Sequence, residues 1–259
     1  MLRKNTKNTL ENRIRVGAVS YLNTKPLLYG LERSDLIRNM DLSLNYPAEV
    51  ARQLIQNEID IGLVPVAIIP ELKEYFIDAD YCIGANGAVA SVAIYCEVPI
   101  EQVTTLLLDY QSRTSVALAR ILVKHYWKVC PRLVASKPGY LQDIGGTVAG
   151  VVIGDRAFAQ KKKSAFEYDL AEAWKNWTGL PFVFAAWVAN KELPEDFIAA
   201  FNYANQQGLW NLEAVIAENS SPDYDLMTYY TQNISYRLDE AKRMGLKKYL
   251  GLLAELPDL

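Results

Sequence analysis

The chain has 259 residues, of which 51% are hydrophobic and 22% are charged, and this composition excludes a disordered protein and favours one or two folded domains. The formal net charge is -3, with both signs scattered along the sequence, so no broad basic field is available to collect nucleic acid or anionic lipid. If the ligand is an anion, local hydrogen-bond donors must hold it.

Residues 1–13 are polar and lack the apolar core of a signal peptide. No later stretch approaches the ~20 apolar residues that a membrane-spanning helix needs. We therefore expect a cytoplasmic protein with no membrane partner. The three cysteines, Cys82, Cys96 and Cys130, are odd in number and have no C-x-x-C spacing, which predicts buried thiols rather than disulfides or a zinc site.

The first part of the chain alternates predicted strands and helices. The elements are a strand at 14–19, a helix that begins at Thr24-Lys25-Pro26, a strand at 42–46, a helix at 48–57 and a buried strand at 59–64. This β-α-β-α-β order is typical of a parallel sheet.

A second series of elements follows the long β-rich segment 88–96. Its members are a strand at 103–108, a helix at 112–126, a strand at 132–135, a short helical turn at 141–144 and an apolar strand at 148–153. The extended apolar segment 180–188 predicts a return crossing to the first sheet. Everything after Pro194 is predicted to be helical, over 195–219 and 222–250.

Two series joined by two crossings predict an α/β protein with two lobes. Each lobe is expected to contain a mostly parallel sheet flanked by helices. The predicted boundaries place residues 1–95 and 189–259 in one lobe and residues 96–188 in the other. The ligand is expected in the cleft between them.

Four segments follow strand ends, where open α/β sheets bind their ligands. They are 20–24, the turn 84–87 with the following Ser91, 111–115, and Gly154-Asp155. The richest is Ser112-Arg113-Thr114-Ser115, because three hydroxyls and a guanidinium at a helix start suit a carboxylate. The same pattern is equally consistent with a simple helix cap beside a surface arginine.

The other candidates also have structural interpretations. Asn23 suits a turn, although its position at a strand end favours ligand contact. Ser91 lies in a β-rich run where an ordinary half-buried serine is common. Asp155 suits a helix cap. The only histidine, His125, shares a helix face with Leu118 and Leu122, which predicts packing beside the core rather than catalysis.

Several nucleotide, hydrolase and metal motifs are missing from the sequence. It contains no G-x-x-x-x-G-K-[ST], no G-x-G-x-x-G after a strand, no G-x-S-x-G and no H-E-x-x-H. We therefore predict no metal site and no cofactor.

Four motifs in the same order resemble those of the chorismate dehydratases of the futalosine route to menaquinone. They are 19–27 (VSYLNTKPL), 112–116 (SRTSV), 153–155 (IGD) and 178–185 (TGLPFVFA). That family has the type II periplasmic-binding-protein fold, which agrees with the predicted lobes. The resemblance implies loss of water from chorismate to give 3-[(1-carboxyvinyl)oxy]benzoate, without a cofactor.

The resemblance also implies roles for individual residues. Asn23 and Ser91 correspond to the catalytic positions, and the enolpyruvyl carboxylate of the substrate takes the proton. The substrate-binding residues are then Tyr21, Ser112, Arg113, Thr114, Ser115, Gly154 and Asp155. One departure is Ala88, which stands where many relatives have proline in the turn before Ser91.

Two other functions compete with this interpretation. The sister enzyme 1,4-dihydroxy-6-naphthoate synthase shares the fold but is expected to carry a different N-terminal motif and a catalytic histidine in the cleft. A solute receptor or sensor would bind a small anion without changing it.

Overall fold

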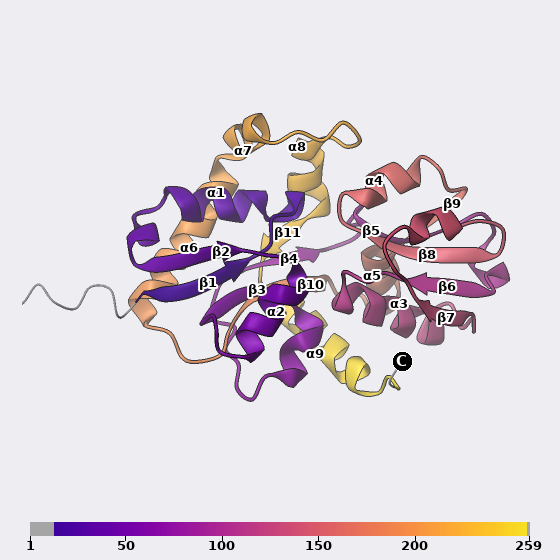
Figure 1. Ribbon diagram of the computed structural model, residues 1–259, viewed down its shortest axis with the longest axis horizontal. Coiled ribbons are helices and arrows are strands. Elements are labelled where there is room, and N and C mark those ends of the chain that lie inside the picture. The colour runs from indigo at the N-terminus through magenta and orange to yellow at the C-terminus, as the bar shows by residue number, and fades with distance from the viewer. Residues whose placement is uncertain (1–12, 258–259) are drawn as a thin grey trace, which may run out of the picture.

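The computed structural model describes residues 13–257, in which two β-sheets lie side by side, each flanked by helices (Figure 1). This arrangement confirms the predicted α/β class. The predicted first lobe extends from residue 1 to residue 259, so its first twelve and last two residues lie outside the described part of the chain.

The first sheet has six strands. In spatial order they are β11 (Ser235–Arg237), β4 (Tyr81–Ala85), β10 (Phe182–Ala189), β3 (Ile61–Pro65), β1 (Ile14–Ala18) and β2 (Met40–Leu44). Strand β1 is parallel to β2 and β3, because α1 (Lys25–Arg33) and α2 (Pro47–Ile55) provide the crossovers. Strand β10 returns antiparallel between β3 and β4.

The second sheet has five strands. In spatial order they are β7 (Arg132–Ala135), β6 (Thr105–Leu108), β8 (Val148–Ile153), β5 (Val92–Cys96) and β9 (Phe166–Asp169). Strand β6 is parallel to β7 and β8, whereas β5 is antiparallel to β8 and β9. Both sheets are therefore mixed rather than mostly parallel, because the strands that follow the crossings run against the parallel trio.

The chain crosses between the sheets twice. It enters the second sheet between β4 and β5, and it returns between α5 (Leu170–Thr178) and β10. The predicted boundaries at 95/96 and 188/189 fall inside β5 and β10. The structure places the whole of β5 in the second sheet and the whole of β10 in the first.

The remaining helices cover the sheets. They are α3 (Arg113–His125), α4 (Arg156–Lys161), α6 (Glu195–Trp210), α7 (Leu212–Glu218), α8 (Leu226–Thr228) and α9 (Glu240–Ala254). Helix α6 packs closely on α1, as Figure 1 shows. A Cβ atom at Gly208 would lie 1.7 Å from the carbonyl oxygen of Pro26, so this contact requires glycine. It holds the start of α1 in place.

The predicted helix at 222–250 is wrong. After α8 the chain forms a π-helical turn at Tyr229–Asn233, then strand β11, and only then α9. The local sequence is compatible with a helix, but β11 instead pairs with the edge of the first sheet next to β4. The predicted helix at 195–219 is divided into α6 and α7 at Asn211.

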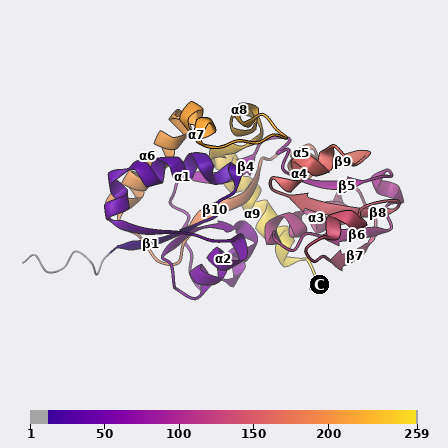
Figure 2. The same cartoon turned by 45° about the horizontal axis from the view of Figure 1, so that its top comes forward.

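Helix α9 joins the two lobes. It packs on β10 and reaches α3 of the second lobe, as Figure 2 shows. Its Tyr249 ring lies edge-on to Trp174 of α5 and Phe182 of β10, with centroid distances of 6.4 and 5.1 Å. Edge-to-face aromatic pairs of this kind contribute about 0.5–1.5 kcal/mol each beyond the area they bury.

The cysteine and histidine predictions have mixed outcomes. Cys82 and Cys96 are buried as predicted, but Cys130 is exposed because it lies in the connection between α3 and β7. His125 stacks on Trp177, with 5.8 Å between ring centroids and 12° between ring planes, which confirms packing. Within residues 13–257 none of the helices is long and apolar enough to cross a membrane.

Candidate functional site

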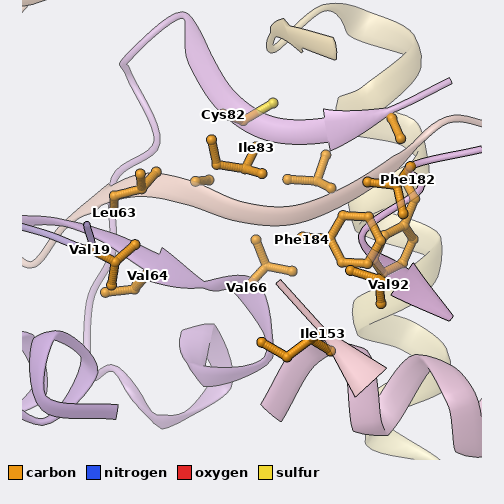
Figure 3. Close-up of a cluster of buried hydrophobic side chains, with 14 of the residues drawn as sticks. Val19, Leu63, Val64, Val66, Cys82, Ile83, Val92, Ile153, Phe182 and Phe184 are labelled. Carbon is orange, nitrogen blue, oxygen red and sulfur yellow. The ribbon is translucent and has the colours of Figure 1, made fainter. Parts of the chain in front are cut away.

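A cavity of about 80 Å³ lies between the two sheets. Its polar lining comes from the connections after β1, β6 and β8 and from the turn before β5. Apolar residues of both sheets form the remainder, among them Val19, Leu63, Ile83, Val92, Ile153 and Phe184, which Figure 3 shows together. A mostly apolar lining with a few converging polar groups is the usual composition of a small-molecule site.

Six of the nine predicted site residues line this cavity. They are Tyr21, Asn23, Ser91, Ser112, Ser115 and Gly154. The fold therefore brings together residues from four separate segments of the sequence. Arg113, Thr114 and Asp155 are absent from the lining.

Tyr21 and Asn23 belong to the first wall, which comes from the short helical turn between β1 and α1. The backbone carbonyl of Asn23 accepts a hydrogen bond from the Tyr236 hydroxyl at 2.9 Å, and its Oδ1 accepts from Thr24 Oγ1 at 3.1 Å. Its Nδ2 has no partner within residues 13–257. This amide group is therefore available to a ligand.

The Tyr21 hydroxyl is a second unpaired group on the first wall. Its oxygen is buried and has no hydrogen-bond partner among the residues that the structure describes. Burial raises the pKa of Tyr21, so the phenol stays protonated and can donate. An orphaned buried hydroxyl is destabilising by about 1–3 kcal/mol unless a ligand or water satisfies it.

Ser112 and Ser115 belong to the second wall, at the start of α3. Ser112 Oγ accepts from the backbone N–H of Ser115 at 3.1 Å and donates to Ser115 Oγ at 2.8 Å. Ser112 is thus both the helix cap and a residue of the cavity lining. The α3 dipole adds partial positive charge at this end of the helix.

Ser91 completes the second wall and is almost fully buried. Its Oγ accepts from the Tyr229 hydroxyl at 2.8 Å, and its carbonyl accepts from the N–H of Gly154 at 2.8 Å. Gly154 has φ of 67°, a left-handed conformation that favours glycine. These bonds fix Ser91 at the edge of the cavity.

The turn before Ser91 depends on a buried carboxylate. Ala90 has φ of 64°, which costs a non-glycine residue about 1–2 kcal/mol. Its N–H donates to Asp169 Oδ2 at 2.7 Å, while Asp169 Oδ1 caps α5. Burial raises the pKa of Asp169 to about 6, although the backbone hydrogen bonds oppose that shift. Asn233 holds the same turn by donating to the carbonyl of Ala88 at 3.1 Å.

The three remaining predicted residues have other contacts. Arg113 forms an exposed ion pair with Glu71. The hydroxyl oxygen of Thr114 accepts from the backbone N–H of Ala67 at 3.2 Å, which buries it in the protein. Asp155 is an exposed residue, yet desolvation of its carboxyl raises its pKa; the neighbouring Leu22 backbone and Lys25 oppose that shift.

Gln111 lies in the candidate segment 111–115 but was not among the nine predicted site residues, and the network that orients it was not predicted. Gln111 lines the cavity, and its Oε1 accepts from Arg156 at 2.8 Å. Arg156 also donates to the buried Asp109 at 2.7 Å, and Tyr140 donates to the same carboxylate oxygen at 2.7 Å. The sequence places Gln111 beside a hydroxyl cluster, but no local pattern marks its tie to Arg156.

Among residues 13–257, the cavity lining contains neither a cluster of metal ligands nor a histidine. No group of three or more His, Cys, Asp or Glu side chains that could hold a metal ion occurs in the described part of the chain. The chain's only histidine, His125, stacks on Trp177 and does not line the cavity. The polar lining consists of hydroxyl, amide and backbone groups.

The sequence of the chain matches a known protein family. Residues 14–255 match the model of a family described as menaquinone biosynthesis. The chain belongs to this family. The match spans both sheets and every residue that lines the cavity.

Individual relatives are similar over nearly their whole length. The chain is 26% identical to the chorismate dehydratase of Thermus thermophilus, covering 90% of this chain and 93% of that protein. It is also 26% identical to the chorismate dehydratase of Campylobacter jejuni, covering 90% and 95%. A Candida albicans protein described as having the generic periplasmic binding protein fold superposes with a TM-score of 0.60 at 15% identity, covering 95% and 92%. The predicted fold is thus confirmed.

Proposed function

We propose that this protein is a chorismate dehydratase, a lyase that removes water from chorismate to give 3-[(1-carboxyvinyl)oxy]benzoate. Membership of the menaquinone biosynthesis family and two relatives of that name support the proposal. The observation that carries it is the convergence of Asn23, Ser91 and Ser112 on one cavity.

The reaction is an elimination that balances without a cofactor. The proton leaves the ring carbon that bears the enolpyruvyl ether, and its electron pair forms a new ring double bond. The neighbouring carbon releases its hydroxyl, and the ring becomes aromatic. We infer that the enolpyruvyl carboxylate accepts the proton and passes it to the departing hydroxyl, so water is the only other product.

The wall residues have complementary roles in this proposal. The free amide of Asn23 orients the enolpyruvyl group or the departing hydroxyl. Ser91 donates to one substrate carboxylate, and Ser115, whose Oγ accepts the proton of Ser112, donates to the other. Fixed donors that meet developing negative charge are typically the largest contribution to this kind of catalysis. The hydroxyl of Tyr21 supplies one further donor.

Entry of the substrate requires movement of the lobes. The cavity of about 80 Å³ is smaller than the ~300–1,000 Å³ typical of small-molecule sites. We propose that the two sheets separate to admit chorismate and close over it. X-ray scattering should then give a larger radius of gyration without chorismate than with it, and identical profiles would contradict this step.

The function is tested by mixing purified protein with chorismate and following the absorbance of the aromatic product. Turnover in proportion to enzyme concentration is the expected result. Tight binding of chorismate that is recovered unchanged would identify a binding protein instead. A folded sample that neither converts nor binds chorismate would refute the proposal.

A further inference from the structure

The hydroxyl of Tyr229 contacts a residue that is distant in sequence and central to the proposed site. It donates to Ser91 Oγ at 2.8 Å across a sequence separation of 138 residues. Tyr229 is fully buried, and its ring lies edge-on to Phe158 with 5.2 Å between centroids. It begins the π-helical turn that precedes β11. Such turns are rare and occur frequently at functional sites.

This hydrogen bond determines which kind of partner the Ser91 hydroxyl can still bind. A serine hydroxyl has one proton to donate and two lone pairs to accept with. Tyr229 occupies a lone pair, so the proton of Ser91 remains for another acceptor. Within residues 13–257 no protein group accepts it, and Ser91 lines the cavity. The acceptor position is therefore left for a ligand.

The backbone around Ser91 is already fixed on both sides. Its carbonyl accepts from Gly154, and the preceding N–H of Ala90 donates to Asp169. The remaining freedom of Ser91 is rotation of its side chain. Tyr229 removes that freedom, because its own ring is locked among other aromatic rings.

We propose that Tyr229 is a positioning residue that holds Ser91 as a hydrogen-bond donor to a substrate carboxylate. The inference rests on the proposed dehydratase function and extends it to a residue in the C-terminal segment. Because a phenol that donates to a hydroxyl strengthens the donor on its other side, Tyr229 also polarises the Ser91 proton. It acts only through Ser91.

A double-mutant cycle tests this role with Tyr229→Phe, Ser91→Ala and the combined variant. Tyr229→Phe should lower kcat/KM about tenfold, the usual size of a lost positioning hydrogen bond. In the Ser91→Ala background the same change should alter kcat/KM by less than about twofold, because the acceptor is already gone. The matched control is Tyr95→Phe, which removes another buried tyrosine hydroxyl that donates to Glu167 at 3.2 Å. It should leave kcat/KM unchanged.

If the fold-losses in kcat/KM of Tyr229→Phe and Ser91→Ala multiply in the combined variant, Tyr229 has a merely structural role and the inference is overturned. Wild-type kcat/KM in Tyr229→Phe would also overturn it. The same cycle is repeated on the Kd for 3-[(1-carboxyvinyl)oxy]benzoate, measured by calorimetry. If the wild type binds this product but never dehydrates chorismate, only the proposed function is refuted. The role of Tyr229 is then still decided by whether the effects of the two substitutions on Kd are additive. A wild type that does neither would refute both.

Discussion

The two walls of the cavity hold their polar groups in different ways. On the first wall, the Nδ2 of Asn23 and the hydroxyl of Tyr21 have no partner within residues 13–257. On the second wall, Ser91 and Ser112 are each already tied to another hydroxyl. The first wall therefore holds unused donors, while the second wall holds donors whose direction is set before a ligand arrives. Such preorganisation avoids reorganisation cost during the reaction.

The largest expected effect comes from the first wall. Asn23→Ala should lower kcat/KM by about 10²–10³-fold, because it removes the unpaired amide donor that orients the substrate. Steady-state kinetics with chorismate measures this loss. The control is Asn211→Ala, because Asn211 lies between α6 and α7 and its exposed amide donates to the Gln207 carbonyl. This variant should keep full activity. Activity close to wild type in Asn23→Ala would eliminate the proposed difference between the walls.

The second wall should show a pH-dependent contribution to stability from Asp169. Burial raises the pKa of Asp169 to about 6, above the value of an unfolded aspartate, so the folded state holds a proton more tightly. The stability from this site is fully present below about pH 4 and is lost as the pH rises through about 6, a change of up to about 3 kcal/mol.

Urea denaturation of wild type and Asp169→Asn measures this dependence. Subtracting the two curves of unfolding free energy against pH isolates Asp169, because the other carboxylates are shared. For example, desolvation raises the pKa of Asp60, but Arg15 and Lys191 lower it by more, to about 2. The stability that Asp60 contributes is therefore lost as the pH falls, which is opposite to the behaviour of Asp169. Parallel curves for the two proteins between about pH 4 and about pH 6 would contradict the role assigned to Asp169.

A smaller effect separates the two serines of α3. Ser115→Ala should raise KM about tenfold, since it removes one charge-assisted hydrogen bond to a carboxylate. Ser112→Ala should raise KM less, because the proton of Ser112 is already donated to Ser115 Oγ. Ser112→Ala should also destabilise the protein by about 1 kcal/mol, because it removes the helix cap. Kinetics and thermal unfolding together test this pair. Equal stability of both variants would show that Ser112 is not needed as a cap.

The smallest effect is expected at Arg113. Arg113→Met should change kcat/KM by less than about twofold, because the guanidinium pairs with Glu71 and exposed ion pairs contribute about 0–1 kcal/mol. Glu71→Gln is the matched variant and should behave alike. A tenfold loss of kcat/KM in Arg113→Met but not in Glu71→Gln would show that the guanidinium of Arg113 contacts the substrate.

Local patterns predicted the parts of the fold that local patterns determine. The alternation of apolar strands and capped helices gave the parallel trios β2-β1-β3 and β7-β6-β8. It failed where a distant partner decides the structure. The segment with Tyr229 and Tyr236 carries helix-compatible residues, and only pairing with β4 makes part of it a strand.

The candidate site divides in the same way. Motif positions such as Asn23, Ser91 and Ser112 were predicted from the sequence and line the cavity. Their supports were not predicted, because Tyr229 and Asp169 reach the turn at Ser91 from elements far along the chain. For the same reason Arg113 and Thr114 were assigned to the cavity although they face other partners. Side-chain direction on a helix start depends on the fold around it.

Product identification by nuclear magnetic resonance tests whether the protein dehydrates chorismate and whether Asn23 is needed for that reaction. Chorismate labelled with deuterium on the ring carbon that bears the enolpyruvyl ether is incubated with wild type and with Asn23→Ala. We expect wild type to give aromatic 3-[(1-carboxyvinyl)oxy]benzoate without the deuterium, and Asn23→Ala to give almost none. Unchanged chorismate with the wild-type protein, or an aromatic product that keeps the label on that carbon, would contradict this expectation.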